Sequence, residues 1–190
     1  MTLYGVELTV RADAEEVASV VADELVAAAR AGQSIVLTGG TSPGRAYELA
    51  AEREPDWNAA SLWWGDERCV PPDDERSNFR LAREALLDRL EAAPREVQRI
   101  RGELGAAEAA GEYDRLLSGV RLDFVLLGLG PDGHAASLFP NQPTLDERER
   151  RATAAEEARD LAHRLARAAD RLTGVGRVAE ERAARLEARL

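Results

Sequence analysis

Residues 122–140 read LDFVLLGLGPDGHAASLFP, and this stretch is the most informative part of the sequence. Its apolar run, residues 124–127, predicts a buried parallel strand. Three glycines follow the run: Gly128, Gly130 and Gly133. They let the backbone turn at the carboxyl end of the strand, where open α/β sheets bind their ligands. The turn delivers His134, one of two histidines in the chain, two residues after Asp132. The pattern therefore predicts a functional site.

The composition limits the class of protein. The 190 residues, 45% of them hydrophobic, suffice for one domain with a proper core. No apolar run approaches the roughly 20 residues of a membrane span, and the first residues do not resemble a signal peptide, so we expect no membrane partner. The net charge of −10 argues against non-specific nucleic-acid binding. Cys69 is the only cysteine, which favours a reducing cytoplasm.

The basic residues are all arginines, and the chain contains no lysine. This excludes a lysine Schiff base and a P-loop of the GK[ST] type. A phosphate would have to be held by guanidinium groups or backbone amides. An anionic small substrate is compatible with an acidic protein, because local arginines can dominate a binding site.

Hydrophobic periodicity predicts strands that alternate with helices. The expected strands are residues 7–10, 34–38, 61–64, 98–101 and 124–127. The expected helices are 14–30, 45–53, 78–90 and 106–117. Asp13 is expected to cap the first of them and Ser77 the third. One face of the first helix is expected to carry Val17, Val20, Val21, Leu25 and Ala28. Alternation of this kind predicts an α/β fold with a mainly parallel sheet and helices on both faces.

The character of the chain changes near its end. We expect an α/β domain at residues 1–145 and an Arg-, Ala- and Glu-rich helical tail at 146–190, with an amphipathic helix around 161–172. His163 falls in this tail, and we interpret it as a surface residue.

Three polar clusters, residues 39–43, 66–68 and 130–137, lie at predicted strand ends. The carboxyl ends of parallel strands share one edge of a sheet, so the clusters can converge. Each also has a structural interpretation: an ordinary glycine turn, a solvated turn, or a histidine that only satisfies its hydrogen bonds. We interpret Trp63 and Trp64 as core residues. Together the clusters suit hydrolysis or proton transfer on a small phosphorylated substrate.

The motifs TGGTSP (38–43), WWGDERCVPPDDERSN (63–78) and LLGLGPDGHAASLFP (126–140) resemble the 6-phosphogluconolactonase family. The resemblance covers roughly residues 5 to 145. It implies a Rossmann-like fold shared with glucosamine-6-phosphate deaminases. It also implies hydrolysis of 6-phosphoglucono-δ-lactone to 6-phosphogluconate in the oxidative pentose phosphate pathway, without a metal or organic cofactor.

The resemblance assigns roles residue by residue. His134 matches the general base that takes a proton from the attacking water, and Asp132 would orient the imidazole or its loop. Arg68 would bind the phosphate or offset charge on the lactone oxygen. The implied substrate-binding residues are Gly39, Gly40, Thr41, Asp66, Arg68, Ser77, Asn78, Gly130 and Gly133. We expect Ser77 and Asn78 to cap the following helix and shape the pocket.

Two alternatives stay open. A deaminase-like isomerase is disfavoured because Phe139 stands where that family has a glutamate. A catalytically weak or inactive sugar-phosphate-binding relative is suggested by the tail, which lacks the family's Arg-Thr element and its second anion-binding arginine. The tail is either a divergent helix or the product of a frameshift in a truncated lactonase. The sequence leaves the oligomeric state open.

Overall fold

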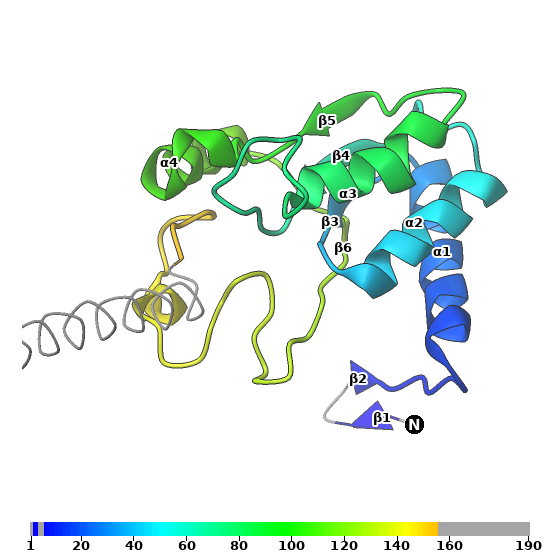
Figure 1. Ribbon diagram of the computed structural model, residues 1–190, viewed down its shortest axis with the longest axis horizontal. Coiled ribbons are helices and arrows are strands. Elements are labelled where there is room, and N and C mark those ends of the chain that lie inside the picture. The colour runs from blue at the N-terminus through cyan, green and yellow to red at the C-terminus, as the bar shows by residue number, and fades with distance from the viewer. Residues whose placement is uncertain (1, 4–5, 156–190) are drawn as a thin grey trace, which may run out of the picture. The chain divides into compact units, whose positions relative to one another are not determined.

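The computed structural model describes residues 2–3 and 6–155, all but the last of which belong to one unit that ends at Ala154 (Figure 1). Its strands are β1 (Thr2–Leu3), β2 (Val6–Glu7), β3 (Ser34–Leu37), β4 (Ser61–Trp64), β5 (Glu96–Gln98) and β6 (Phe124–Val125). Its α-helices are α1 (Ala14–Arg30), α2 (Thr41–Arg53), α3 (Asn78–Ala85) and α4 (Ala106–Leu116). Short 3-10 turns are η1 (Leu87–Arg89), η2 (Gly102–Leu104) and η3 (Pro143–Asp146).

The main sheet has the strand order β5-β4-β3-β6, and all its neighbouring strands are parallel. β1 and β2 form a separate antiparallel pair. In the register of β3 and β4, Leu37 is opposite Trp64, so the two strands end together. β6 runs beside β3 in the same direction, with Val125 opposite Val36. The segments after all three strands therefore leave one edge of the sheet, called here the carboxyl edge.

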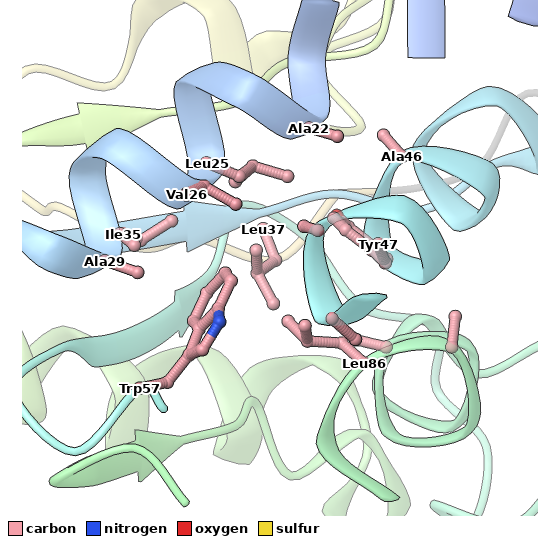
Figure 2. Close-up of a cluster of buried hydrophobic side chains, with 14 of the residues drawn as sticks. Ala22, Leu25, Val26, Ala29, Ile35, Leu37, Ala46, Tyr47, Trp57 and Leu86 are labelled. Carbon is pink, nitrogen blue, oxygen red and sulfur yellow. The ribbon is translucent and has the colours of Figure 1, made fainter. Parts of the chain in front are cut away.

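The helices cover both faces of the sheet, as predicted. Ile35, Leu37, Leu62 and Trp64 pack in one buried cluster with residues of α1, α2 and α3, part of which is shown in Figure 2. Val36 and Trp63 point to the opposite face and pack with Tyr113 and Leu117 of the α4 region. This alternation follows from the period of two in a strand. The prediction that both tryptophans belong to the core is confirmed.

Small side chains set how α1 packs against α2. The buried positions of α1 are Ala18, Ala22, Leu25, Val26, Ala28 and Ala29. The predicted face was right for Leu25 and Ala28 and wrong for Val17, which is exposed. The alanines let the two helices approach closely, and Figure 2 shows Ala22 of α1 beside Ala46 of α2. The Asp13 cap is confirmed, because its side chain accepts from the Glu16 N–H at 2.9 Å.

The prediction of a buried strand at 124–127 was wrong in its burial. β6 covers only Phe124–Val125, and the side chains of Val125 and Leu127 are 48% and 53% exposed. β6 pairs with β3 alone among the described residues, so it is an edge strand there. An apolar run predicts a parallel strand, but the burial of its side chains depends on what covers each face of the sheet at that strand.

Several element boundaries also differ from the prediction. The first predicted strand is Val6–Glu7, and residues 8–10 are exposed and irregular. α2 begins at Thr41 rather than at residue 45. The helix after Ser77 ends at Ala85 and continues as the 3-10 turn η1, and the strand expected at 98–101 is β5, Glu96–Gln98.

The described chain ends soon after a contact with α4. The Arg151 and Ala152 N–H groups donate to Asp114 Oδ1 at 2.6 and 3.2 Å, and Arg151 Nη1 donates to the Leu117 carbonyl. The predicted helix at 161–172 and His163 lie outside the described residues, as does the proposed tail from residue 156 onward. Residues 147–155 of that tail are described, and they are irregular rather than helical as predicted. The division at 145/146 stays a prediction. Within residues 2–3 and 6–155, no helix is long and apolar enough to cross a membrane.

Candidate active site

His134 and Asp132 form a hydrogen-bonded pair on the loop after β6. His134 Nδ1 lies 2.6 Å from Asp132 Oδ1, and the same oxygen accepts from the His134 backbone N–H at 3.3 Å. The sequence left open whether Asp132 orients the imidazole or its loop. The contacts show that it contributes to both.

The hydrogen bond within the pair determines which ring nitrogen of His134 carries the proton. The hydrogen bond from His134 lowers the pKa of the Asp132 carboxyl, so Asp132 is ionised at neutral pH. An ionised carboxylate only accepts hydrogen bonds, and Nδ1 therefore carries the proton that it donates. In the neutral imidazole the lone pair then belongs to Nε2. Nε2 has no hydrogen-bond partner among the described residues, and about a third of the side chain (32%) is exposed.

The loop needs glycine at two places around this pair. A Cβ on Gly130 would lie 2.9 Å from Asp132 Oδ1 and closer still to the His134 ring, so only glycine lets the ring sit there. Gly133 has φ +87°, a conformation that other residues rarely adopt. On its other side, the His134 ring packs on Phe139 with the ring centroids 4.6 Å apart.

Hydrogen bonds join two of the three predicted clusters at the carboxyl edge, and a close approach of Gly39 brings in the third. Ser137 Oγ donates to Asp66 Oδ2 at 2.6 Å, which ties the His134 loop to the end of β4. Asn78 Nδ2 donates to the Asp66 carbonyl at 3.0 Å and to Asp66 Oδ1 at 3.2 Å. A Cβ on Gly39 would lie 2.6 Å from Asn78 Cγ, so the loop after β3 touches the same amide. The predicted convergence is present for these residues.

Glu67 is an organising residue that the sequence interpretation missed. Its carboxylate accepts from the Asn78 and Phe79 N–H groups at 2.8 Å each and from Ser77 Oγ at 3.0 Å. Ser77 Oγ in turn accepts from the Arg80 N–H at 3.1 Å, which confirms the predicted cap. The N-terminus of α3 is thus satisfied inside the protein. An acidic residue ten positions before a Ser-Asn pair was the available signal.

The N-terminus of α2 is arranged differently. Gly40, at φ +113°, precedes the helix, and no side chain caps it. Thr41 and Ser42 begin the helix, are exposed and are followed by no acidic residue in the first turn. Exposed backbone N–H groups at a helix N-terminus favour an anion. Of the two helix N-termini, that of α2 can therefore accept a negatively charged ligand, whereas that of α3 is already occupied by Glu67.

Two buried tyrosines hold the ends of the central strands. Tyr47 Oη accepts from the Thr38 N–H at 2.9 Å and donates to the Thr38 carbonyl at 2.7 Å. Tyr113 Oη makes the same pair of bonds to Trp64, at 2.8 and 3.1 Å. Burial raises the pKa of both phenols, so both stay neutral. The tyrosines therefore hold the backbone in place where the loops at Gly39 and Asp66 begin.

The remaining predicted residues occupy distinct places. Ser77 and Asn78 are buried and bonded within the protein, which suits support of the site more than contact with a substrate. Arg68 is exposed, and its backbone carbonyl lies against Gly102 beyond β5. Within the described residues, no group of three or more His, Cys, Asp and Glu side chains is placed to hold a metal ion.

Comparison with known proteins identifies the family. The family model described as glucosamine-6-phosphate isomerases/6-phosphogluconolactonase matches residues 9–177. The chain belongs to this family. The family match extends past residue 145, where the motif resemblance ends.

Individual relatives within the family are similar over part of their length. The chain is 39% identical over 120 residues to a 6-phosphogluconolactonase of Treponema pallidum, covering 57% of this chain and 49% of the relative. It is 41% identical over 138 residues to one of Mycobacterium leprae, covering 65% and 56%. The solved 6-phosphogluconolactonase of Trypanosoma cruzi aligns with a TM-score of 0.72 at 26% identity, over 83% of this chain and 71% of that one. The chain spans about half the length of the curated relatives that it matches.

Proposed function

We propose that this chain hydrolyses 6-phosphoglucono-δ-lactone to 6-phosphogluconate, with His134 as the general base. The observation that carries the proposal is the 2.6 Å contact between His134 Nδ1 and Asp132 Oδ1, which leaves the Nε2 lone pair for a proton. Relatives that carry the name 6-phosphogluconolactonase, at 39% and 41% identity, support the substrate.

The chemistry requires one base that later acts as an acid. Nε2 of His134 takes a proton from water while the water oxygen bonds to the lactone carbonyl carbon, and the carbonyl electrons move to its oxygen. When that oxyanion re-forms the carbonyl, the bond from carbon to the ring oxygen breaks. The ring oxygen takes the proton from the imidazolium and becomes a hydroxyl group. Asp132 stabilises the imidazolium between the two transfers.

The phosphate of the substrate is proposed to lie at the N-terminus of α2. The backbone amides after Gly40 and the positive end of the helix dipole suit a dianion, and no acidic residue in the first turn opposes it. Arg68 is proposed as the guanidinium partner, in keeping with a chain that has no lysine. The substrate needs no metal or organic cofactor for this route.

Phe139 favours the lactonase within a family whose description includes both activities. Its ring occupies one side of the His134 imidazole at 4.6 Å, where a carboxylate partner would be needed for ring-opening isomerisation. An aromatic ring cannot exchange a proton with the histidine. A cytoplasmic location is proposed on the single cysteine, Cys69, alone.

A hydrolysis assay corrected for spontaneous lactone opening tests the proposal. His134→Ala is expected to lower kcat by about 10²- to 10⁴-fold, the usual contribution of a general base. Substitution of the second histidine, His163→Ala, is the matched control and should leave the rate unchanged. Equal rates for the wild-type chain and His134→Ala would remove the enzymatic interpretation. Retained binding of 6-phosphogluconate by both proteins would then indicate a sugar-phosphate-binding relative.

A further inference from the structure

We infer that Asp66 and Ser137 act as a positioning pair that holds the His134 loop in its reactive conformation. The inference deepens the proposed function and rests on it. The two residues are 71 positions apart, and Ser137 Oγ donates to Asp66 Oδ2 at 2.6 Å. The motif resemblance assigned Asp66 to substrate binding and gave Ser137 no role.

Ser137 lies in a tight turn of the backbone. Ala136 and Ser137 have φ of +48° and +60°, and the Leu138 N–H donates to the Ala135 carbonyl at 2.8 Å. Two consecutive residues in the left-handed region form a tight two-residue turn, for which glycine and asparagine are the favoured residues. A turn of two other residues persists only when surrounding contacts hold it.

The Asp66 carboxylate that holds the turn is itself bonded on both oxygens. Each carboxylate oxygen of Asp66 already accepts a bond from this chain, Oδ1 from Asn78 and Oδ2 from Ser137. Asn78 is only 5% exposed, and its amide also holds the Asp66 carbonyl. A Cβ on Gly65 would lie 3.8 Å from the Ala136 methyl, so the turn also rests against the end of β4. The sheet thereby fixes the turn.

The turn is connected to the imidazole through the residues on either side of it. His134 immediately precedes the Ala135–Leu138 bridge, and Phe139 immediately follows it. The reversal of the chain brings the two rings to 4.6 Å with an interplanar angle of 44°. Asp132 fixes the imidazole from one direction, and the turn fixes it from another through Phe139. Loss of the bond to Asp66 should loosen the second support and leave the first intact.

The test compares Ser137→Ala and Ser137→Gly with a control, Ser118→Ala, in an exposed loop after α4. Alanine removes the hydroxyl, whereas glycine removes it and also relieves the left-handed backbone. Both variants are expected to lose about tenfold in kcat, as for a hydrogen bond to a charged group, with KM changed by less than about twofold. The control should match the wild type. A rise in KM with kcat unchanged would overturn the inference and support substrate binding, and full activity of Ser137→Gly would assign the effect to backbone strain.

Asp66→Asn completes a double-mutant cycle. If the two side chains act through one bond, Asp66→Asn with Ser137→Ala should be no slower than the slower single variant. Multiplicative effects on kcat would overturn the inference, because Asp66 would then act independently of Ser137.

A readout independent of activity separates this inference from the proposed function. The Phe139 ring should shift the His134 ring-proton NMR signals, which the variant His163→Gln assigns. In Ser137→Ala these signals should move toward those of an unstructured histidine. If the wild-type chain hydrolyses the lactone no faster than water does, the proposed function fails, while the shift still supports the pair. Unchanged signals in Ser137→Ala would overturn the pair whatever the activity.

Discussion

We expect that Gly39 cannot be replaced by alanine without a loss of stability, because the Asn78 side chain occupies the place of the new Cβ. Its φ lies outside the left-handed region, so an alanine backbone would be unstrained there. A Cβ at this position would nevertheless lie 2.6 Å from Asn78 Cγ, 3.1 Å from Nδ2 and closer still to Oδ1. Gly39→Ala therefore forces the buried Asn78 amide either to move or to accept the overlap.

The magnitude follows from those two responses. If Asn78 moves, it abandons its bonds to the Asp66 carbonyl and carboxylate, and unsatisfied buried polar groups cost about 1–3 kcal/mol. If it stays, overpacking costs about 1–3 kcal/mol. The responses are alternatives rather than additions, so Gly39→Ala should lower the free energy of unfolding by about 2 kcal/mol. That is a large share of the roughly 5–15 kcal/mol that stabilises a typical domain.

Urea unfolding followed by tryptophan fluorescence measures this effect, and the Asn78→Ala background isolates its cause. In that background the obstructing amide is gone, so Gly39→Ala should cost less than about 0.5 kcal/mol, the usual range for a change without such a mechanism. An equal loss in both backgrounds would refute the reasoning, since Gly39 would then act through its backbone. A loss near zero in the wild-type background would refute it as well.

Three further predictions concern other parts of the fold. Tyr47→Phe should lower the free energy of unfolding by about 2 kcal/mol, because the buried Thr38 N–H and carbonyl both lose their partner; an unchanged urea midpoint would contradict this. Gly111→Ala in α4 should raise the free energy of unfolding by about 0.5–1 kcal/mol, because among the described residues the new Cβ would meet only Arg115 Nη1, at 3.8 Å. The hydrogen bond from Arg99 lowers the pKa of Glu103 to about 2. The pair therefore stabilises the fold at pH values above the ordinary carboxyl pKa of about 4.3, and this stabilisation is lost as the pH falls toward 2. Glu103→Gln should therefore cost about 0.5 kcal/mol in urea unfolding at pH 7 and almost nothing at pH 2, and a constant difference would contradict the assignment.

Local sequence patterns predicted the strands, the places where they end and the helix caps. An apolar run that ends in glycine identifies a strand and its exit, and Ser77 before a helical stretch identifies a cap, because each depends on neighbours within four residues. The convergence of the three clusters also follows from the sequence, since it requires only that the strands are parallel. The family resemblance then depended on the order and spacing of those same strand exits.

Contacts between distant residues could not be predicted in the same way. The bonds from Ser137 to Asp66 and from Asn78 to Asp66 depend on how two loops meet, not on either loop alone. The prediction that β6 is buried was wrong for a related reason. Its apolar residues would be equally suited to the centre or the edge of a sheet, and only its neighbours decide between them.

The carboxyl edge carries two helix N-termini with opposite tasks, and the residue types explain the difference. The segment after β4 supplies Glu67, whose carboxylate occupies the N-terminus of α3 as a permanent anion. The segment after β3 supplies Gly39 and Gly40, which bring no side chain, so no side chain caps the N-terminus of α2 and the Thr41 and Ser42 N–H groups are available to the proposed phosphate. An acidic side chain at position 40 would satisfy α2 in the way Glu67 satisfies α3, and it would repel a phosphate from the same place. The absence of a side chain after β3 is therefore as much a part of the proposed phosphate site as the amides themselves.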